Sequence, residues 1–147
     1  MKTEKIAVVR VRGIRNMEPK IKFALGYVRL HRPNHCVLLN GTPHTIGTLK
    51  IIKDYVTFGN IDEETLVKLL YKRGEKGGKL LRETMKEEQI KKVAKEIIEA
   101  NKPLGNYVDV VFRLHPPRKG YKNIKKHYPY GDLGKRDNMN ELIKRMI

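Results

Sequence analysis

The residues that could do chemistry are concentrated in one stretch, residues 112–136, called here the basic segment. It reads FRLHPPRKGYKNIKKHYPYGDLGKR, with Asp132 as its only acid and with aromatic and imidazole rings between the cations. Positive charge beside flat stacking surfaces suits single-stranded or looped nucleic acid. The segment therefore predicts a nucleic-acid contact made by Arg113, His115, Arg118, Lys119, Tyr121, Lys122, Lys125, Lys126, His127, Tyr128 and Arg136.

The basic segment is a poor candidate for a helix or a central strand, because proline and glycine interrupt it repeatedly. Almost nothing between Arg118 and Lys126 is apolar, so little burial offsets the entropy of ordering this part of the chain. We therefore expect a partner to order the segment. The alternative is a disordered basic tail with no particular target.

The charge of the whole chain points to the same class of partner. Lys and Arg number 32 against 16 Asp and Glu, a net charge of +16 on 147 residues, and such self-repulsion favours binding to a polyanion. The single Cys36 excludes an internal disulfide framework, and no signal peptide or long apolar run is visible. We expect a cytoplasmic protein that does not insert into membranes; peripheral membrane binding is the weaker alternative, since no basic amphipathic helix is evident.

The first part of the chain predicts a compact α+β unit over about residues 5–59. Alternating apolar residues indicate a strand at 6–13, a helix follows around 16–32, and a short strand covers 36–39. A second helix is expected from about Thr45, burying Ile46, Leu49 and Ile52, before a strand at 56–59. This order predicts a small β-α-β-α-β unit whose helices pack on one face of a mainly antiparallel sheet.

A second group of cations belongs to this unit. In the first strand one face is apolar, whereas the other ends in two arginines, as expected where a strand leaves the core at a charged surface. The first helix and its exit carry further cations, although a solvated helix face is the simpler reading for each of them. The candidate phosphate contacts of this group are Arg10, Arg12, Arg15, Lys20, Lys22, Arg29, His31, Arg32 and His35.

The remaining elements predict a helical insertion and a C-terminal extension. Asp62 is a candidate helix N-cap, and a later helix is expected near Thr84 with Glu87 completing a capping box. That helix should bury Ile90, Val93, Ala94, Ile97 and Ile98, and stop at Asn101, Pro103 and Gly105. A strand at 108–114 then leads into the basic segment, and a short final helix should pack through Leu142, Ile143 and Met146.

Catalytic and metal-binding readings are weak. GEKGGK at 74–79 has one residue too few between its outer glycines for a phosphate-binding loop, and Leu80 stands where that loop needs Ser or Thr. His31, His35, Cys36 and His44 lack a paired zinc-ligand spacing. No carboxylate pair or activated nucleophile is apparent. We expect no enzyme activity, no cofactor, no metal and no small-molecule substrate.

At three places in order along the chain the sequence resembles the ribosomal protein uL30 family, called L30 in bacteria and archaea and L7 in eukaryotes. The motifs are RLHRPNHCVLLNGTPHTIGTLKIIKDYVTFG at 29–59, LVKLLYKRG at 66–74, and the basic segment followed by NELIKRMI. The last resembles the signature of archaeal and eukaryotic members, and the archaeal type is favoured. One departure, HTIGTL at 44–49 where a methionine is expected before the leucine, concerns packing only.

The resemblance implies a structural protein of the large ribosomal subunit that binds large-subunit rRNA, contributes to ribosome assembly and translation, and contacts neighbouring ribosomal proteins. It implies an L30-type core at residues 1–59, a helical insertion at 60–106 and a C-terminal strand, basic tail and helix at 107–147, as one structural unit. Lys72 and Arg73 join the candidate RNA-binding residues through the second motif. A free nucleic-acid-binding regulatory protein using the same basic surface is the alternative.

Overall fold

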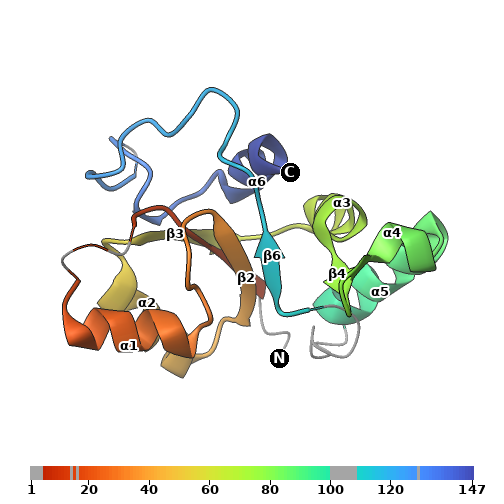
Figure 1. Ribbon diagram of the computed structural model, residues 1–147, viewed down its shortest axis with the longest axis horizontal. Helices are drawn as coiled ribbons and strands as arrows, with labels where there is room; N and C mark the ends of the chain where they lie inside the picture. The colour runs from red at the N-terminus through yellow and green to blue at the C-terminus, as the bar shows by residue number, and fades with distance from the viewer. Residues whose placement is uncertain (1–4, 14, 16, 100–108, 129) are drawn as a thin grey trace.

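The computed structural model describes residues 5–13, 15, 17–99, 109–128 and 130–147 (Figure 1). Its main sheet has the strand order β6-β2-β1-β3-β7, and every neighbouring pair is antiparallel except β3 and β7. A two-stranded hairpin forms a second sheet. The strands of the main sheet are β1 Lys5–Arg10, β2 His35–Asn40, β3 Val56–Asn60, β6 Val111–Arg113 and β7 Gly134–Lys135.

Two helices cover one face of the sheet, which confirms the predicted α+β unit. Helix α1 (Pro19–Tyr27) begins with proline at its first position, and α2 (Pro43–Ile52) begins after Thr42, whose hydroxyl accepts a hydrogen bond from the Thr45 backbone N–H at 3.3 Å. Their buried side chains pack on one apolar layer of the strands. This first cluster contains Val8, Ala24, Leu25, Val28, Leu30, Val37, Leu49, Ile52 and Val56.

The opposite face of the same sheet is covered by later parts of the chain. Helices α3 (Glu63–Arg73), α5 (Glu87–Glu99) and α6 (Met139–Met146) pack there. Their buried side chains share a second cluster with Ala7, Val9 and Cys36 of the central strands and with Phe112 of β6. Strand β1 is therefore buried on both faces, as its nearly continuous apolar sequence requires.

The insertion differs in detail from the predictions. Asp62 does cap α3, accepting the Thr65 backbone N–H at 2.8 Å, but Thr84 ends a short helix α4 (Leu81–Thr84) and does not cap α5. The glycines after α3 form the turn of a hairpin, β4 (Glu75–Lys76) and β5 (Lys79–Leu80), which the sequence reading missed.

Other predicted boundaries shift by a few residues. Helix α2 starts two residues earlier than expected and leaves Ile46 exposed, because its inward positions are Leu49 and Ile52. The packing of the α5 stripe and of α6 agrees with the expected pattern. The proposed cap at Asn16, the helix stop at Asn101, Pro103 and Gly105, and the strand start at Val108 lie outside the described residues.

Candidate nucleic-acid interface

One end of the main sheet collects cationic side chains because of how its strands run. The antiparallel register places the last residues of β1 beside the first residues of β2 and β3, with Val9 opposite Cys36 and Arg10 opposite Val56. It also sets His35 directly opposite Arg113 at the outer pair, β2 and β6. Segments distant in sequence thus meet at what we call the basic end of the sheet: residues 10–12, the turn 29–35, and β6 with the basic segment that follows it.

The electrostatics of His35 show how closely these cations gather. Partial burial lowers the pKa of His35 below its ordinary value, and the nearby charges of Arg113, Arg32, His31 and Arg10 lower it further. Arg113 remains largely exposed, with its Nη1 3.8 Å from the Glu75 carboxylate. A site that already disfavours one more positive charge is suited to an incoming anion.

Arg10 does not belong to the exposed part of this surface. Its side chain is only 3% exposed, and it donates hydrogen bonds to the carbonyl oxygens of Leu30 at 2.8 Å, Arg12 at 3.0 Å and Gly13 at 3.3 Å. These bonds fix the exits of β1 and of α1 against each other. Arg10, predicted as a phosphate contact, therefore lies beneath the basic end, where it braces the backbone.

Arg12 lies at the edge of the same end in a half-buried position. Its guanidinium stacks over the Tyr55 ring at 4.9 Å from the centroid and points toward the Asp54 carbonyl oxygen at 3.5 Å. Stacking on an aromatic ring orients an arginine while leaving donors available to an anion.

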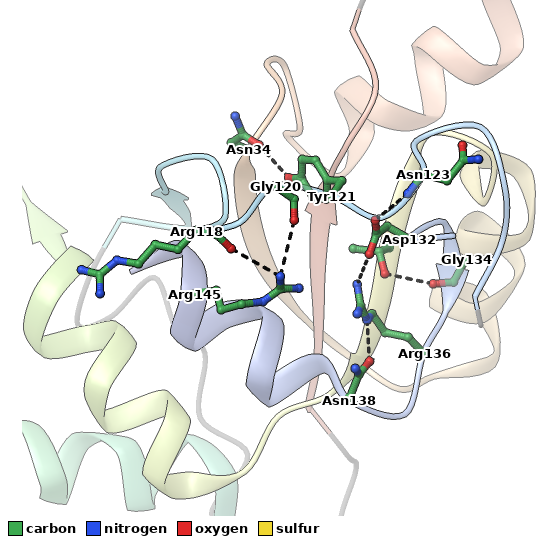
Figure 2. A network of polar contacts seen from close by, with 11 residues as sticks. Asn34, Arg118, Gly120, Tyr121, Asn123, Asp132, Gly134, Arg136, Asn138 and Arg145 are labelled. Atoms are coloured by element: carbon green, nitrogen blue, oxygen red, sulfur yellow. Dashed lines mark hydrogen bonds and ion pairs between the residues drawn. The ribbon is translucent and has the colours of Figure 1, made fainter. Parts of the chain in front are cut away.

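The basic segment follows a defined path along the rest of the chain. It runs out from the end of β6, passes β3 and returns to α6 (Figure 1). An ion pair organises the return: Arg136 Nη1 donates to Asp132 Oδ1 at 3.1 Å, and both side chains are 4% exposed. Asp132 Oδ2 also accepts the Asn123 backbone N–H at 3.2 Å, while Arg136 Nε donates to Asn138 Oδ1 at 2.8 Å (Figure 2).

Arg136 is accordingly the second predicted RNA-binding residue that the structure places inside the protein. Its guanidinium also lies 5.6 Å from the centre of the Tyr128 ring, so Tyr128 already has a cation on one face. His127, in turn, lies with its Nε2 2.7 Å from Asp54 Oδ1, which attaches the segment to the turn between α2 and β3. These three side chains hold the segment in place.

Tyr121 joins the start of the segment to the core. Its hydroxyl donates to Asn34 Oδ1 at 2.7 Å, and burial raises the pKa of its phenol (Figure 2). The backbone N–H of Asn34, at φ 66°, donates in turn to the Arg10 carbonyl at 2.7 Å. Tyr121 is therefore a strut between the basic segment and the basic end, and its expected stacking role is limited to what its exposed edge can contact.

Helix α6 fixes the other side of the loop. The backbone N–H groups of His115 and Arg118 donate to the carbonyls of Met146 and Arg145, at 3.1 and 3.0 Å. Arg145 Nη1 points back to the carbonyls of Arg118 and Gly120, 3.4 Å from each (Figure 2). The predicted side chains beyond β6 that stay exposed on this framework are His115, Arg118, Lys119, Lys122, Lys125, Lys126 and His127.

The other predicted residues are spread more widely. Arg29, His31 and Arg32 are exposed in the turn that enters β2, so the structure brings them to the basic end. Arg15 precedes α1, and Lys20 and Lys22 lie exposed within it. Lys72 and Arg73 occupy the last turn of α3.

Sequence reasoning missed three residues that shape the interface: Asn34, Asp132 and Arg145. The signal for Asp132 was present, since it is the single acid among many cations and precedes Arg136 by four residues. Asn34 follows a proline at a turn, where a positive φ suits asparagine. Arg145 sits on a helix face and carried no such signal.

Other chemistry finds little support in the described parts of the chain. No group of three or more His, Cys, Asp or Glu there could hold a metal ion, and none of the helices described is long and apolar enough to cross a membrane. Cys36 is fully buried, and desolvation raises the pKa of its thiol to about 12, which keeps it protonated and unreactive.

Comparison with known proteins gives a single family. A model of the ribosomal protein L30p/L7e family matches residues 6–56. The large ribosomal subunit protein uL30 of Archaeoglobus fulgidus is 46% identical, with 95% of this chain and 98% of the relative aligned. The uL30 proteins of Methanococcus maripaludis and Methanothrix thermoacetophila are 42% and 38% identical, over 96% and 95% of this chain and 98% of each relative. Such similarity over nearly the whole length shows that this chain belongs to the uL30 family of large-ribosomal-subunit proteins.

Proposed function

We propose that this chain binds large-subunit rRNA through the basic end of the sheet and the exposed cations of the basic segment, and so stabilises folded rRNA during and after subunit assembly. Its family consists of structural proteins of the large ribosomal subunit, not enzymes, and places the chain in the cytoplasm at the ribosome.

The observation that carries this proposal is the meeting of two cationic regions at one place. His35 and Arg113 face each other across β2 and β6, within electrostatic range of Arg32 and His31. The basic segment, which includes Arg113, continues beyond β6 and adds further exposed cations. Phosphate contacts of this kind supply much of the affinity and fix orientation, whereas the shape of the folded RNA provides specificity.

The surface also has a composition that fits RNA better than a protein partner. Long cationic side chains and histidines dominate it, and the carboxylates nearby are already engaged, Glu75 with Arg113 and Asp54 with His127. Interfaces between proteins are depleted in lysine. Neighbouring ribosomal proteins are therefore expected to contact other faces of the chain.

The test is to replace three exposed arginines of this surface together, Arg32→Gln, Arg113→Gln and Arg118→Gln. We expect binding to a large-subunit rRNA transcript to weaken more than about tenfold near 0.15 M salt. The log-log salt slope should fall by about 2 to 3, since each lost phosphate contact removes roughly 0.7 to 0.9. Incorporation into large subunits on sucrose gradients should fall in parallel.

The matched control replaces three exposed lysines of α5, Lys91, Lys92 and Lys95, by glutamine. This control makes the same change in net charge on the helical insertion, whose acids and bases nearly balance. Equal losses in the two triple variants would show that overall charge, and not this surface, drives binding. That result would overturn the proposal.

A further inference from the structure

The basic segment keeps its shape with almost no apolar packing after Leu114. Among described residues 115–128 and 130–136, the buried apolar side chains are Pro117 and Leu133. The segment and α6 line an open hollow of about 320 Å³ whose lining residues are largely polar and charged, including Asp132, Arg136 and Arg145. Polar contacts, and not apolar packing, therefore hold this segment in its conformation.

Asp132 is at the centre of those contacts. Its carboxylate accepts from Arg136 at 3.1 Å and from the Asn123 backbone N–H at 3.2 Å, while its own N–H donates to the Asn123 carbonyl at 3.0 Å. The next residue, Leu133, donates to the Lys126 carbonyl at 3.2 Å. The buried Asp132 and the residue after it thus connect two parts of the loop, residues 123–126, which include Lys125 and Lys126, and residues 132–133.

Gly131 shows how closely these two parts of the loop approach each other. A Cβ atom added there would lie 2.6 Å from the Lys126 carbonyl carbon and 2.8 Å from the Asn123 carbonyl oxygen. Only glycine fits such a backbone crossing. The crossing places Asp132 within hydrogen-bond distance of Asn123 and holds the backbone at Lys126 against the returning chain.

We propose that Asp132 is a positioning residue for rRNA binding: a buried acid, paired with Arg136, that holds the cations of the basic segment in their binding arrangement before RNA arrives. This inference rests on the proposed function, because it assumes that these cations meet rRNA. If the loop is ordered before RNA binds, the entropy cost of ordering it does not reduce the free energy of binding. An acid inside a basic surface then increases affinity for a polyanion.

The proposal predicts an effect opposite to that of simple electrostatics. Asp132→Asn raises the net charge by one, so Coulomb attraction alone would leave RNA binding unchanged or make it tighter. If Asp132 positions the loop, the variant binds large-subunit rRNA about tenfold more weakly, with a shallower salt slope because fewer cations reach phosphate at once. The measurement is filter binding of the full-length protein at several salt concentrations.

Asp137→Asn is the matched control. Asp137 is exposed in the same part of the chain, and its replacement makes the same change in net charge. We expect it to bind within about twofold of the parent protein, or slightly tighter. Equal affinities for Asp132→Asn and Asp137→Asn would overturn the inference.

Hydrogen exchange separates a positioning effect from general unfolding. In Asp132→Asn the amides of Asp132 and Leu133 should lose protection, whereas those of Ala7 and Val9 in the central strand should keep it. Asp132→Glu, which keeps the charge, should recover part of the affinity. A variant that binds weakly with its loop amides fully protected would contradict the proposal.

A second variant tests the same idea if Asp132→Asn fails to fold. Tyr121→Phe removes only the hydroxyl that reaches Asn34 and changes no charge. We expect about threefold weaker rRNA binding, against no change for Tyr130→Phe, whose ring is 77% exposed. If the parent chain itself does not bind large-subunit rRNA, the proposed function fails. If the parent binds, and Asp132→Asn and Tyr121→Phe bind as tightly as the parent, only this inference fails.

Discussion

The two cationic regions of this protein are supported in different ways. The turn at 29–35 stands on the core, because Leu30 is fully buried in the first apolar cluster and its carbonyl accepts from Arg10. The basic segment stands on the pair Asp132 and Arg136 and on backbone bonds around a polar hollow. The turn at 29–35 therefore depends on apolar burial, whereas the basic segment depends on correctly paired charges.

The largest expected effect tests the apolar support. Leu30→Ala should lower the free energy of unfolding by about 3 kcal/mol, because it leaves a cavity beneath the turn. Ile124→Ala makes a related truncation in the basic segment, where the side chain is 44% exposed, and should change stability by less than about 0.5 kcal/mol. Urea denaturation measures both. Comparable losses would mean that the segment has an apolar core after all.

The next effect separates a bracing arginine from a binding arginine. Arg10→Met removes the side-chain donor to the buried Leu30 carbonyl and to the partly buried Arg12 carbonyl, and should cost about 2 kcal/mol of stability. Arg32→Met removes an exposed side chain and should leave stability within about 0.5 kcal/mol while weakening rRNA binding. The pair is measured by denaturation and by filter binding. A stable Arg10→Met variant with weak RNA binding would reverse our assignment.

The contrast between Arg10 and Arg32 also shows how far the sequence could lead. Strand alternation and helical spacing predicted the α+β unit with helices on one face of its sheet, because those patterns record which face of an element is buried. They also located the cations. They did not predict that α3, α5 and α6 cover the opposite face. They could not tell that Arg10 is buried, since the carbonyls that accept its hydrogen bonds belong to residues 12, 13 and 30, which only the fold brings together.

The basic segment shows the same limit in a different form. Its composition shows only that few of its side chains could bury apolar surface. Composition does not report pairing: Asp132, Arg136 and Tyr121 order the loop through contacts with specific geometry. The spacing of Asp132 and Arg136 could be seen in the sequence, but the hydrogen bond from Tyr121 to Asn34 joins residues 87 positions apart, which no local pattern encodes.

A smaller effect is expected where the core meets the basic segment. Thr57 is fully buried in β3, and its hydroxyl donates to the Gly134 carbonyl of β7 at 3.2 Å. Thr57→Val keeps the shape and removes that bond, so we expect a loss of about 1 kcal/mol. Hydrogen exchange should show lost protection at Leu133 and Arg136 before any change at Val9. A uniform loss of hydrogen-exchange protection across the sheet would mean that this contact stabilises the core as much as the basic segment.

The smallest effect is a pH dependence carried by His35. The folded pKa of His35 lies below the ordinary histidine value of about 6.5, owing first to burial and then to neighbouring cations. Below pH 6.5 the unfolded chain therefore binds more protons at this residue than the folded chain does. The contribution of His35 to stability is complete above that value and is lost as the pH falls through it toward the folded pKa.

RNA should invert that trend, because phosphate beside His35 favours its charged form. Lowering the pH from 8 to 6 should weaken the free protein against urea yet tighten rRNA binding by up to a few-fold. His35→Gln should reduce both slopes, whereas His44→Gln, on α2 beside Tyr27 and outside this cationic group, should leave them unchanged. If His35→Gln flattens the stability profile but not the binding profile, then His35 is buried near cations without facing the RNA. In that case the basic segment would contact the RNA, and the turn at 29–35 would support the fold without contacting RNA.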